Sequence, residues 1–327
     1  MAAFIKSLAT ANPPKKVTQE RVYQFLSSRF KLEDEEKRLY EKILCDGPIK
    51  TRHFGLDEDE EILLQDQDQL IERFLKHGRL TGAKAARKAL TRAKLGPKDV
   101  GCIIVNTCTG YLCPGLSSYL VEDLSLDGSV KVVDIAGMGC GAAIPNLECA
   151  ARMAPPENRV ALSIAVEICS ATFFMEPEPD LVVSNSIFAD GASAAVVAQT
   201  KSNDCRKIVT LLDFESLVLP KERESLRYRS IQGRLRNTLA KKVPVVAARG
   251  VKEVTGTILK RNGLAPDEIA FWAVHPGGSL VLERIQKELK LPAGALDFSY
   301  QILRNYGNMS SPSVMFVLER MMKKAKP

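Results

Sequence analysis

Histidine and tryptophan are scarce in this sequence, and long hydrophobic runs are missing from it. There are only three histidines and one tryptophan among 327 residues. None of the eight cysteines has a second cysteine three positions away, so the spacing of a zinc site is missing and we expect no bound metal. No stretch reaches the roughly 18 apolar residues that a membrane-spanning helix needs. The sequence therefore argues against a zinc protein and against a membrane protein.

Basic and acidic residues are close to balance. Lys and Arg number 46 against 39 Asp and Glu, which gives a formal net charge of +7. The basic residues are scattered and are not interleaved with aromatic ones, so nucleic acid is not the expected partner. Residues 1–17, MAAFIKSLATANPPKKV, contain neither a long apolar core nor a small-residue cleavage site, unlike a signal peptide. We therefore expect reduced thiols in a cytoplasmic protein.

The periodicity of apolar residues divides the chain into a helical beginning and an alternating remainder. Apolar residues recur three and four positions apart in residues 18–30 and 33–44, which predicts two amphipathic helices. From Gly82 onwards, helical stretches alternate with strands that are rich in Val, Ile and Leu, as in a sheet covered on both faces. The strands are expected at residues 100–107, 129–137, 158–168, 191–199 and 207–217.

An internal repeat is the most informative feature of the sequence. Residues 89–106, ALTRAKLGPKDVGCIIVN, align without a gap with residues 258–275, ILKRNGLAPDEIAFWAVH. Residues 139–153 align with residues 307–321 in the same order and at nearly the same spacing. Because two matches share one spacing, they predict a duplicated α/β unit.

The duplication gives Cys140 a second interpretation besides that of a small buried residue at a tight turn. In the overlay it falls on Asn308, and each of the two follows a glycine and opens a helix. A helix N-terminus favours a thiolate, since its backbone N–H groups and dipole stabilise negative charge. His275 ends a predicted strand just before a Pro-Gly-Gly turn. We expect residues 1–205 to form the half that carries the cysteine, and residues 206–327 the half that carries the histidine and asparagine.

Each of these three residues also has a purely structural interpretation. Asn308 suits a helix N-cap, His275 suits a turn, and Cys140 suits a crowded glycine-rich corner. The ends of strands and the starts of helices are, however, where α/β proteins place their chemistry. The repeat therefore allows the three side chains to converge on one point.

Three segments carry a resemblance to a known family. GCGAA around Cys140, FWAVHPGG around His275 and YGNMSSPSVMFVLE around Asn308 resemble the type III polyketide synthases, the chalcone and stilbene synthase family. The segments IKSLATANPPKKVTQ, CDGPIKTRH and IFADGASAAVV are also similar, so the resemblance covers nearly the whole chain. It implies the thiolase-like α/β fold, in which a duplicated unit gives a five-layer αβαβα architecture. It also implies a catalytic Cys140-His275-Asn308 site.

The resemblance implies an activity and its partners. An acyl-CoA starter would load on Cys140 and be extended by decarboxylative condensation with malonyl-CoA, and the product would then cyclise. No metal or redox cofactor would be needed, because coenzyme A thioesters are the substrates. The family pairs as homodimers, in which a residue before a proline reaches the neighbour's pocket; here that residue is Cys113. The family's substrate pocket maps onto Cys108, Cys169, Thr172, Phe188 and Ser310.

Two departures from the family pattern bear on the substrate. Residues 222–244 look short and offer no counterpart of one of the two phenylalanines that guard the pocket, although Phe188 matches the other. A basic residue that grips the coenzyme A phosphates in plant enzymes falls on Gly47, with Lys42, Lys50 and Arg52 nearby as candidates to replace it.

The pocket positions also suggest the kind of starter. Plant enzymes with phenolic starters have hydroxyl residues at the positions of Cys108 and Cys169. Because a thiol is a weak hydrogen-bond partner, we expect aliphatic starters to be preferred.

Three alternative functions remain at this stage. A priming ketoacyl synthase III-like condensing enzyme shares the fold and the Cys-His-Asn trio, although HPGG and GNMSS favour the polyketide branch. A papain-like cysteine hydrolase has the same chain order but would need a CGSCW-like segment, which is missing. A non-catalytic binding protein of the same fold is disfavoured because all three residues are present.

Overall fold

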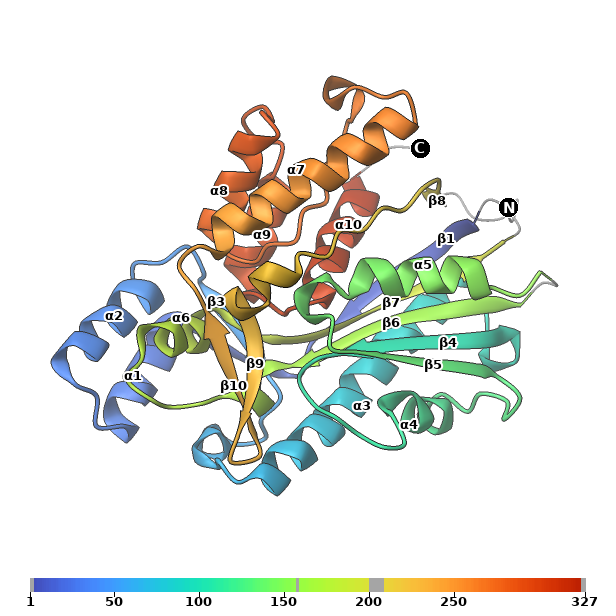
Figure 1. Cartoon of the computed structure of the whole chain (residues 1–327). Coiled ribbons are helices and arrows are strands. Elements are labelled where there is room, and N and C mark those ends of the chain that lie inside the picture. Colours follow the sequence, from blue (N-terminus) through green and yellow to red (C-terminus); the bar gives the residue numbers. More distant parts are fainter. Residues whose placement is uncertain (1–2, 157–158, 200–208, 325–327) are drawn as a thin grey trace.

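The computed structural model describes residues 3–156, 159–199 and 209–324, and its largest element is a six-stranded mixed sheet (Figure 1). The strand order is β5-β4-β6-β7-β1-β8. β4 is parallel to both β5 and β6, whereas β7 is antiparallel to β6 and to β1. The six strands are β1 (Ala3–Ala11), β4 (Val100–Thr107), β5 (Lys131–Ala136), β6 (Val160–Ile168), β7 (Asp190–Ala198) and β8 (Val209–Leu211).

Helices cover both faces of this sheet, as the sequence predicted. α3 (Gln67–Ala93) and α4 (Leu116–Asp123) pack on one face. α5 (Ala143–Met153) and α10 (Pro312–Lys324) pack on the other. Successive residues of β4 contribute alternately to the two hydrophobic cores, because side chains of a strand point to opposite faces in turn. The expected boundary between residues 205 and 206 lies outside the described residues.

The first part of the chain contains the two predicted amphipathic helices, α1 (Gln19–Arg29) and α2 (Asp34–Leu44). α1 begins after Thr18, whose side chain accepts a hydrogen bond from the Arg21 backbone N–H. The two helices pack with α6 (Pro179–Ile187) at one end of the sheet. The other strands of the described residues form two antiparallel pairs: β2 (Lys15–Thr18) with β3 (Thr51–Phe54), and the hairpin of β9 (Leu226–Ile231) and β10 (Arg234–Leu239).

The repeat is visible in the local structure. In the first copy, α3 is followed by a 3-10 turn, η2 (Pro97–Asp99), and then by β4. In the second copy, α7 (Val243–Arg261) is followed by η6 (Pro266–Glu268) and then by residues 269–275. The strand predicted for residues 269–275 is wrong. This segment has no ladder partner within the described chain, so it cannot form the backbone hydrogen bonds that define a strand.

The second half lies against the outer side of α10. α7 packs against α8 (Ser279–Glu288), and α9 (Asp297–Tyr306) contacts both α8 and α10. Trp272 and Val274 of the extended segment join a hydrophobic cluster with residues of α8 and α9. α3 with α4, the sheet, and α5 with α10 thus give three layers. Residues 269–275 and the helices α7 and α8 lie outside these layers, on the side of α10.

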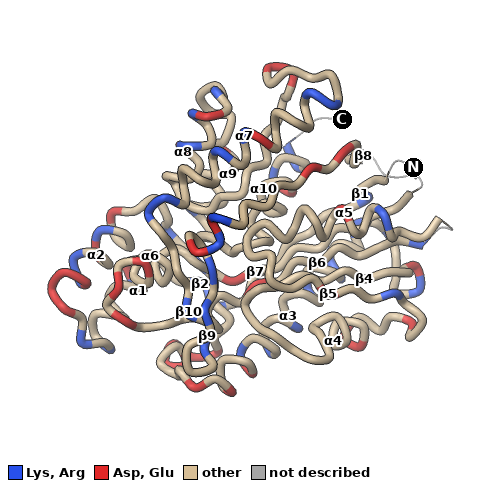
Figure 2. The backbone as a smooth tube through the Cα atoms, viewed as in Figure 1, with Lys and Arg blue, Asp and Glu red and all other residues tan. Residues whose placement is uncertain are grey.

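The distribution of charged residues and the hydropathy of the helices agree with the expectations from the composition. Figure 2 shows Lys and Arg interspersed with Asp and Glu over most elements. Within the described ranges, no helix combines the length and the apolarity that crossing a membrane requires.

Candidate active site

Cys140 lies where the sequence placed it, at the start of a helical segment. It is the middle residue of the 3-10 turn η3 (Gly139–Gly141), which leads directly into α5. Gly139 has a φ of +56°, which favours glycine. A Cβ added at Gly139 or Gly141 would meet no atom within 4 Å, so the turn that carries the sulfur borders open space.

Asn308 is held rigidly in front of α10. It is only 3% exposed. Its Nδ2 donates to the Gly277 carbonyl at 3.1 Å, and its Oδ1 accepts from the Ser310 backbone N–H at 2.8 Å. Its backbone N–H and C=O pair with Ile187 and Ala189 on either side of Phe188. The bond to Ser310 closes a local turn before the helix, which begins at Pro312, so Asn308 does not cap its first turn.

His275 and Asn308 meet at the glycine turn. The imidazole Nε2 lies 3.4 Å from the position that a Cβ on Gly277 would take, so a larger residue there would press on the ring. The Nδ1 atom is buried and has no hydrogen-bond partner within the described chain. Burial lowers the pKa of His275 to about 4, so the ring is neutral at pH 7.

Ser310 links this pair to the cysteine. The Ser310 hydroxyl lowers the pKa of Cys140 and so favours the thiolate, while the Ser310 backbone N–H donates to the Asn308 side chain. The side chains of Cys140, Asn308 and His275 are therefore joined by one series of contacts through Ser310 and Gly277. The three residues that the repeat singled out lie in one site.

The predicted low-pKa thiolate is not what the structure shows. Burial raises the pKa of Cys140 to about 11, the neighbouring Glu167 also raises it, and the hydrogen bond from Ser310 lowers it only in part. The helix N-terminus does not overcome the loss of hydration around the sulfur. The free site therefore contains a neutral thiol and a neutral imidazole.

Glu167, at the end of β6, is a functional candidate that the sequence interpretation missed. It is fully buried, and its carboxylate accepts hydrogen bonds from the Cys108 backbone N–H, the Thr109 hydroxyl and the Ser311 hydroxyl at 2.8–3.0 Å. The Cys108 sulfur lies 3.4 Å from the same carboxylate. Burial raises the pKa of Glu167 above its ordinary value. A single acidic residue in the apolar strand VALSIAVEI was the available signal.

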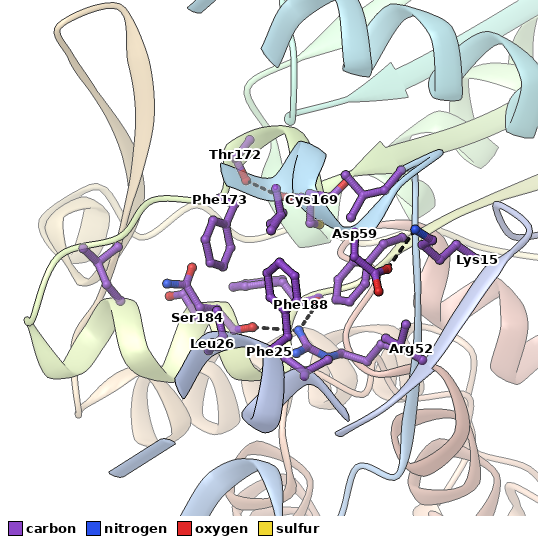
Figure 3. Close-up of a pocket in the computed structure, with 18 of the residues that line it drawn as sticks. Lys15, Phe25, Leu26, Arg52, Asp59, Cys169, Thr172, Phe173, Ser184 and Phe188 are labelled. Carbon is purple, nitrogen blue, oxygen red and sulfur yellow. Dashed lines mark hydrogen bonds and ion pairs between the residues drawn. The ribbon is translucent and has the colours of Figure 1, made fainter. Parts of the chain in front are cut away.

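The five predicted pocket residues fall into two groups. Cys108 and Ser310 contact each other at 3.6 Å beside Glu167. The other three line a pocket next to α1 (Figure 3): Cys169, Thr172 and Phe188.

Tyr228, from β9, also lines this pocket and was not anticipated. Its hydroxyl lies 3.2 Å from the Thr172 hydroxyl, and burial raises its pKa well above the ordinary range. Because Tyr228 lies among polar and charged residues in the sequence, the sequence did not predict that its side chain would be buried.

Arg52 is not available to hold a coenzyme A phosphate. It is 1% exposed, and its Nη1 donates to the carbonyls of Asn185 and Phe188 at 2.7 and 2.6 Å. Burial lowers the pKa of Arg52 to about 9. Of the three basic residues near Gly47, only Lys42 and Lys50 have surface exposure.

Cys113 is exposed and precedes Pro114, to which it is joined by a cis peptide bond. It lies in the connection between β4 and α4.

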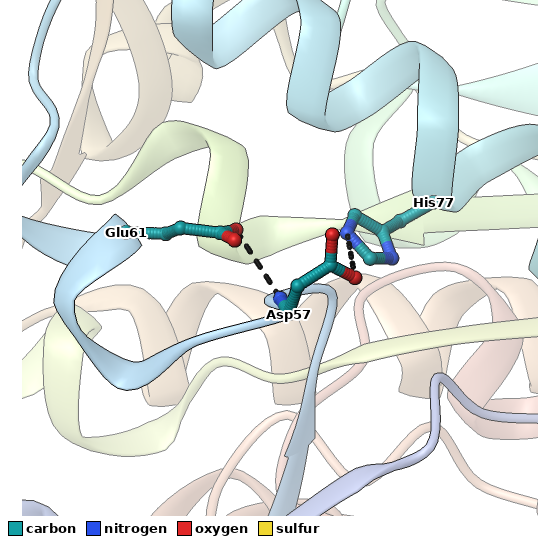
Figure 4. Close-up of side chains that lie close together, drawn as sticks. All are labelled: Asp57, Glu61 and His77. Atoms are coloured by element: carbon teal, nitrogen blue, oxygen red, sulfur yellow. Dashed lines mark hydrogen bonds and ion pairs between the residues drawn. The ribbon is translucent and has the colours of Figure 1, made fainter.

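Among the residues that the structure describes, one group of side chains has ligand atoms close enough together for a metal: Asp57, Glu61 and His77 (Figure 4). Asp57 already pairs with the Lys76 ammonium group, and His77 Nε2 lies 3.9 Å from the same carboxylate. Glu61 accepts hydrogen bonds from two backbone N–H groups at 3.2 Å. These ion pairs and hydrogen bonds explain why the three side chains lie close together without a metal.

Comparison with known proteins settles the family. The family model for FAE1/type III polyketide synthase-like proteins matches residues 8–262, and that for chalcone and stilbene synthases, C-terminal domain, matches residues 215–327. The chain belongs to the type III polyketide synthase family.

Individual relatives and a solved structure agree with this assignment and confirm the thiolase-like fold. The 3,5-dihydroxyphenylacetyl-CoA synthase of Streptomyces toyocaensis is 30% identical over 87% of this chain and 75% of that protein. The alpha-pyrone synthesis polyketide synthase-like Pks18 of Mycobacterium tuberculosis is 27% identical over 99% of this chain and 84% of that protein. The crystal structure of PKS-I from the brown alga Ectocarpus siliculosus superposes with a TM-score of 0.90, at 29% identity over 99% of this chain and 89% of that chain. The protein is thus a condensing acyltransferase of the polyketide synthase type.

Proposed function

We propose that this polyketide synthase loads an acyl-CoA starter on Cys140 and extends it with malonyl-CoA at a site completed by His275 and Asn308. The observation that supports this most strongly is the series of contacts joining the three residues through Ser310 and Gly277. The coenzyme A thioester in the name of the relative from Streptomyces toyocaensis supports coenzyme A thioesters as substrates.

Loading begins from a neutral thiol. The Cys140 sulfur attacks the thioester carbonyl, its proton passes to the imidazole of His275, and the coenzyme A thiolate leaves and takes up that proton. Because the thiol pKa is about 11 and the imidazole pKa about 4, proton transfer is expected to accompany the attack and not to precede it.

Decarboxylation uses the other polar groups of the site. The bond between the malonyl Cα and its carboxylate breaks, CO2 leaves, and the electron pair moves onto the thioester oxygen to give an enolate. The Asn308 amide has two N–H donors, of which one is used by Gly277, so one remains for this oxygen. A neutral His275 can donate a second N–H. The enolate carbon then attacks the acyl carbonyl, releases the Cys140 thiolate and lengthens the chain by two carbons.

This reaction needs no metal or redox cofactor. Cyclisation of the extended chain follows release from the sulfur or accompanies it. Within the same proposal, residues 1–205 supply the nucleophile, residues 206–327 supply the oxyanion donors, and the enzyme acts in the cytoplasm.

We also propose a homodimer formed through the β5 side of the molecule. β5 is an edge strand of the sheet, and an unpaired edge favours association with another chain. Exposed apolar side chains lie on or near this edge: Tyr111, Val132, Met138 and Ile144. Cys113 lies in the connection between β4 and α4, and in this dimer it would face the partner's pocket. Sedimentation showing a 36.0 kDa particle at micromolar concentration would reject the dimer.

Incubation with radiolabelled malonyl-CoA and a panel of acyl-CoA starters tests the catalytic proposal. We expect labelled CO2 and products extended by two or more malonyl-derived units. A single extension would favour a priming ketoacyl synthase, and hydrolysis of peptides without CO2 release would favour a cysteine hydrolase.

A further inference from the structure

Arg52 is the largest of the fully buried side chains in the described part of the chain. It lies in β3 and is 1% exposed, and Asp190 is the carboxylate that contributes most to balancing its charge. Removing a guanidinium group from water is costly unless its N–H groups are bonded and its charge is compensated. The groups to which Arg52 is bonded therefore show what its burial achieves.

The hydrogen bonds of Arg52 converge on the C-terminal end of α6. Its Nη1 donates to the carbonyls of Asn185 and Phe188 at 2.7 and 2.6 Å (Figure 3). Its Nε donates to the side chain of Gln19 at 2.7 Å, and the Gln19 Nε2 donates in turn to the Ser186 carbonyl at 2.8 Å. The last carbonyls of a helix have no partners within the helix, and a positive charge beside them is favourable. Arg52 and Gln19 together hold the end of α6 and the residue that follows it.

The backbone that Arg52 holds is also the backbone that holds Asn308. The Asn308 N–H donates to the Ile187 carbonyl at 2.8 Å, and the Ala189 N–H donates to the Asn308 carbonyl at 2.9 Å. These two bonds lie on either side of Phe188, whose own carbonyl accepts from Arg52. Hydrogen bonds therefore link the guanidinium group to the backbone of Asn308 through residues 187–189.

Arg52 also contacts the residue directly before Asn308. Gly307 has a φ of +70°, which favours glycine. A Cβ added at Gly307 would lie 2.9 Å from the Arg52 Cγ and 2.9 Å from the Ile187 carbonyl oxygen. The aliphatic stem of Arg52 therefore packs against the backbone that leads into Asn308, while its guanidinium group holds the segment with which Asn308 pairs.

We infer that Arg52 is a positioning residue for the Asn308 amide, and that it keeps the spare N–H of this amide directed at the oxygen of the enolate. The inference rests on the role proposed above for Asn308 in decarboxylation. A displacement of about 1 Å at such a site can lower a rate by about 10²-fold. Lysine is a poor replacement for Arg52, because a single ammonium group does not reproduce the planar set of donors that bonds two carbonyls and a side chain.

Separate assays of the two half-reactions on Arg52→Lys test the positioning role. Release of labelled CO2 from malonyl-CoA measures decarboxylation, and intact-protein mass spectrometry with an acyl-CoA measures loading on Cys140. We expect the kcat of decarboxylation to fall by about tenfold or more, while the KM for malonyl-CoA and the rate of loading change by less than about twofold. Arg52→Met also removes the charge and should lower decarboxylation further. Arg52→Lys keeps the test decisive if Arg52→Met fails to fold.

Arg73→Lys is the matched control for disturbing a buried arginine. Arg73 is also buried, its guanidinium group donates to the carbonyls of Ser170 and Glu61, and Asp190 likewise contributes to balancing its charge. These bonds do not reach residues 187–189 or Asn308. Arg73→Lys should therefore leave the ratio of decarboxylation to loading unchanged, whatever it does to stability.

A double substitution asks whether Arg52 acts through Asn308. In Asn308→Ala the amide donor is missing, so its position no longer matters. Adding Arg52→Lys to Asn308→Ala should then lower decarboxylation by less than about twofold further. If the two effects multiply, Arg52 acts independently of Asn308 and the inference is overturned.

The outcomes separate the positioning role from the proposed function. If the wild-type protein neither loads nor decarboxylates, or if Asn308→Ala decarboxylates at the wild-type rate, the proposed function fails and the positioning role fails with it. If Asn308→Ala loses decarboxylation and Arg52→Lys keeps it, the positioning role fails alone. Equal losses of loading and decarboxylation in Arg52→Lys would make Arg52 a purely structural residue. A higher KM for malonyl-CoA at unchanged kcat would assign substrate binding to the Arg52 Nη2, which has no hydrogen-bond partner among the described residues. Either of these last two results would overturn the inference.

Discussion

Both copies of the repeat have a helix followed by a 3-10 turn, but the polar residues at the ends of the two copies have different surroundings. Asn106, at the end of β4, corresponds to His275 at the end of residues 269–275. Asn106 is fully buried; its Nδ2 donates to Ser311 and its Oδ1 accepts from Asn146, each at 2.8 Å. The Nδ1 of His275 has no partner in the described part of the chain. The first copy uses its polar residue to hold the fold, and the second leaves a polar group free for chemistry.

Cys140 and Asn308 are the second pair of equivalent positions. Here it is the residue of the second copy, Asn308, that is held by hydrogen bonds. Asn308 is fixed by bonds to Gly277 and Ser310 and by two backbone pairs. Cys140, in the first copy, borders open space at a glycine turn and is bonded through its side chain to Ser310. The two equivalent positions thus differ: Asn308 is held by side-chain and backbone hydrogen bonds, whereas the turn around Cys140 borders open space.

The largest expected effect comes from removing the nucleophile. Cys140→Ala should abolish the acyl adduct seen by intact-protein mass spectrometry with an acyl-CoA and lower product formation by at least about 10³-fold. Cys149→Ala, in the same helical segment, is the control and should retain both. An adduct that survives in Cys140→Ala would show that another cysteine is the nucleophile.

The next effect concerns the ionisation of the same sulfur. Because the pKa of Cys140 is about 11, the thiolate fraction grows about tenfold with each pH unit below that value. The rate of alkylation by iodoacetamide at Cys140, followed by peptide mass spectrometry, should therefore climb steadily from pH 7 to pH 10. A plateau reached below pH 8 would reveal an activated thiolate and contradict the account of the free site.

Substitution of Asn106 and of His275 should have different effects on the free energy of unfolding. Asn106→Ala leaves two buried partners, Ser311 and Asn146, with a missing hydrogen bond, and should lower the free energy of unfolding by about 1–3 kcal/mol. His275→Ala removes no hydrogen bond of Nδ1 and should change it by less than about 1 kcal/mol. Urea unfolding followed by circular dichroism compares the two, and equal losses would erase the distinction between the copies.

A pH dependence of stability is also expected. The pKa of His275 is lowered from 6.5 to about 4 in the folded protein, so the unfolded chain binds more protons between these values. This residue's contribution is complete above pH 6.5 and is lost as the pH falls towards 4. Wild-type protein should therefore lose more stability over that window than His275→Ala does. Parallel curves for the two proteins would indicate an unshifted histidine.

Much of the scaffold could be predicted from sequence because it follows periodicity. The amphipathic helices α1 and α2 and the strands β4 and β6 were confirmed, since each is encoded in its own local pattern. Residues 269–275 have the same apolar character as β4 but no neighbouring strand, and a partner in space cannot be deduced from a local pattern.

Of the site, only the residues that the internal repeat pointed to could be predicted from the sequence. The convergence of Cys140, His275 and Asn308 on one reaction centre stays a prediction, whereas the raised pKa of Cys140 depends on burial among residues distant in sequence. Glu167 and Tyr228 were missed for the same reason, because their enclosure results from packing between separate segments.

Separate assays of loading and decarboxylation on Asn308→Ala test the central claim most directly. Removal of one oxyanion donor typically costs about 10²–10³ in rate. We therefore predict that malonyl-CoA decarboxylation falls by this factor while acyl loading on Cys140 stays largely intact. Asn305→Ala, an exposed asparagine on α9, is the control and should change neither. Decarboxylation at the wild-type rate, or an equal loss of loading in a folded Asn308→Ala protein, would contradict the account.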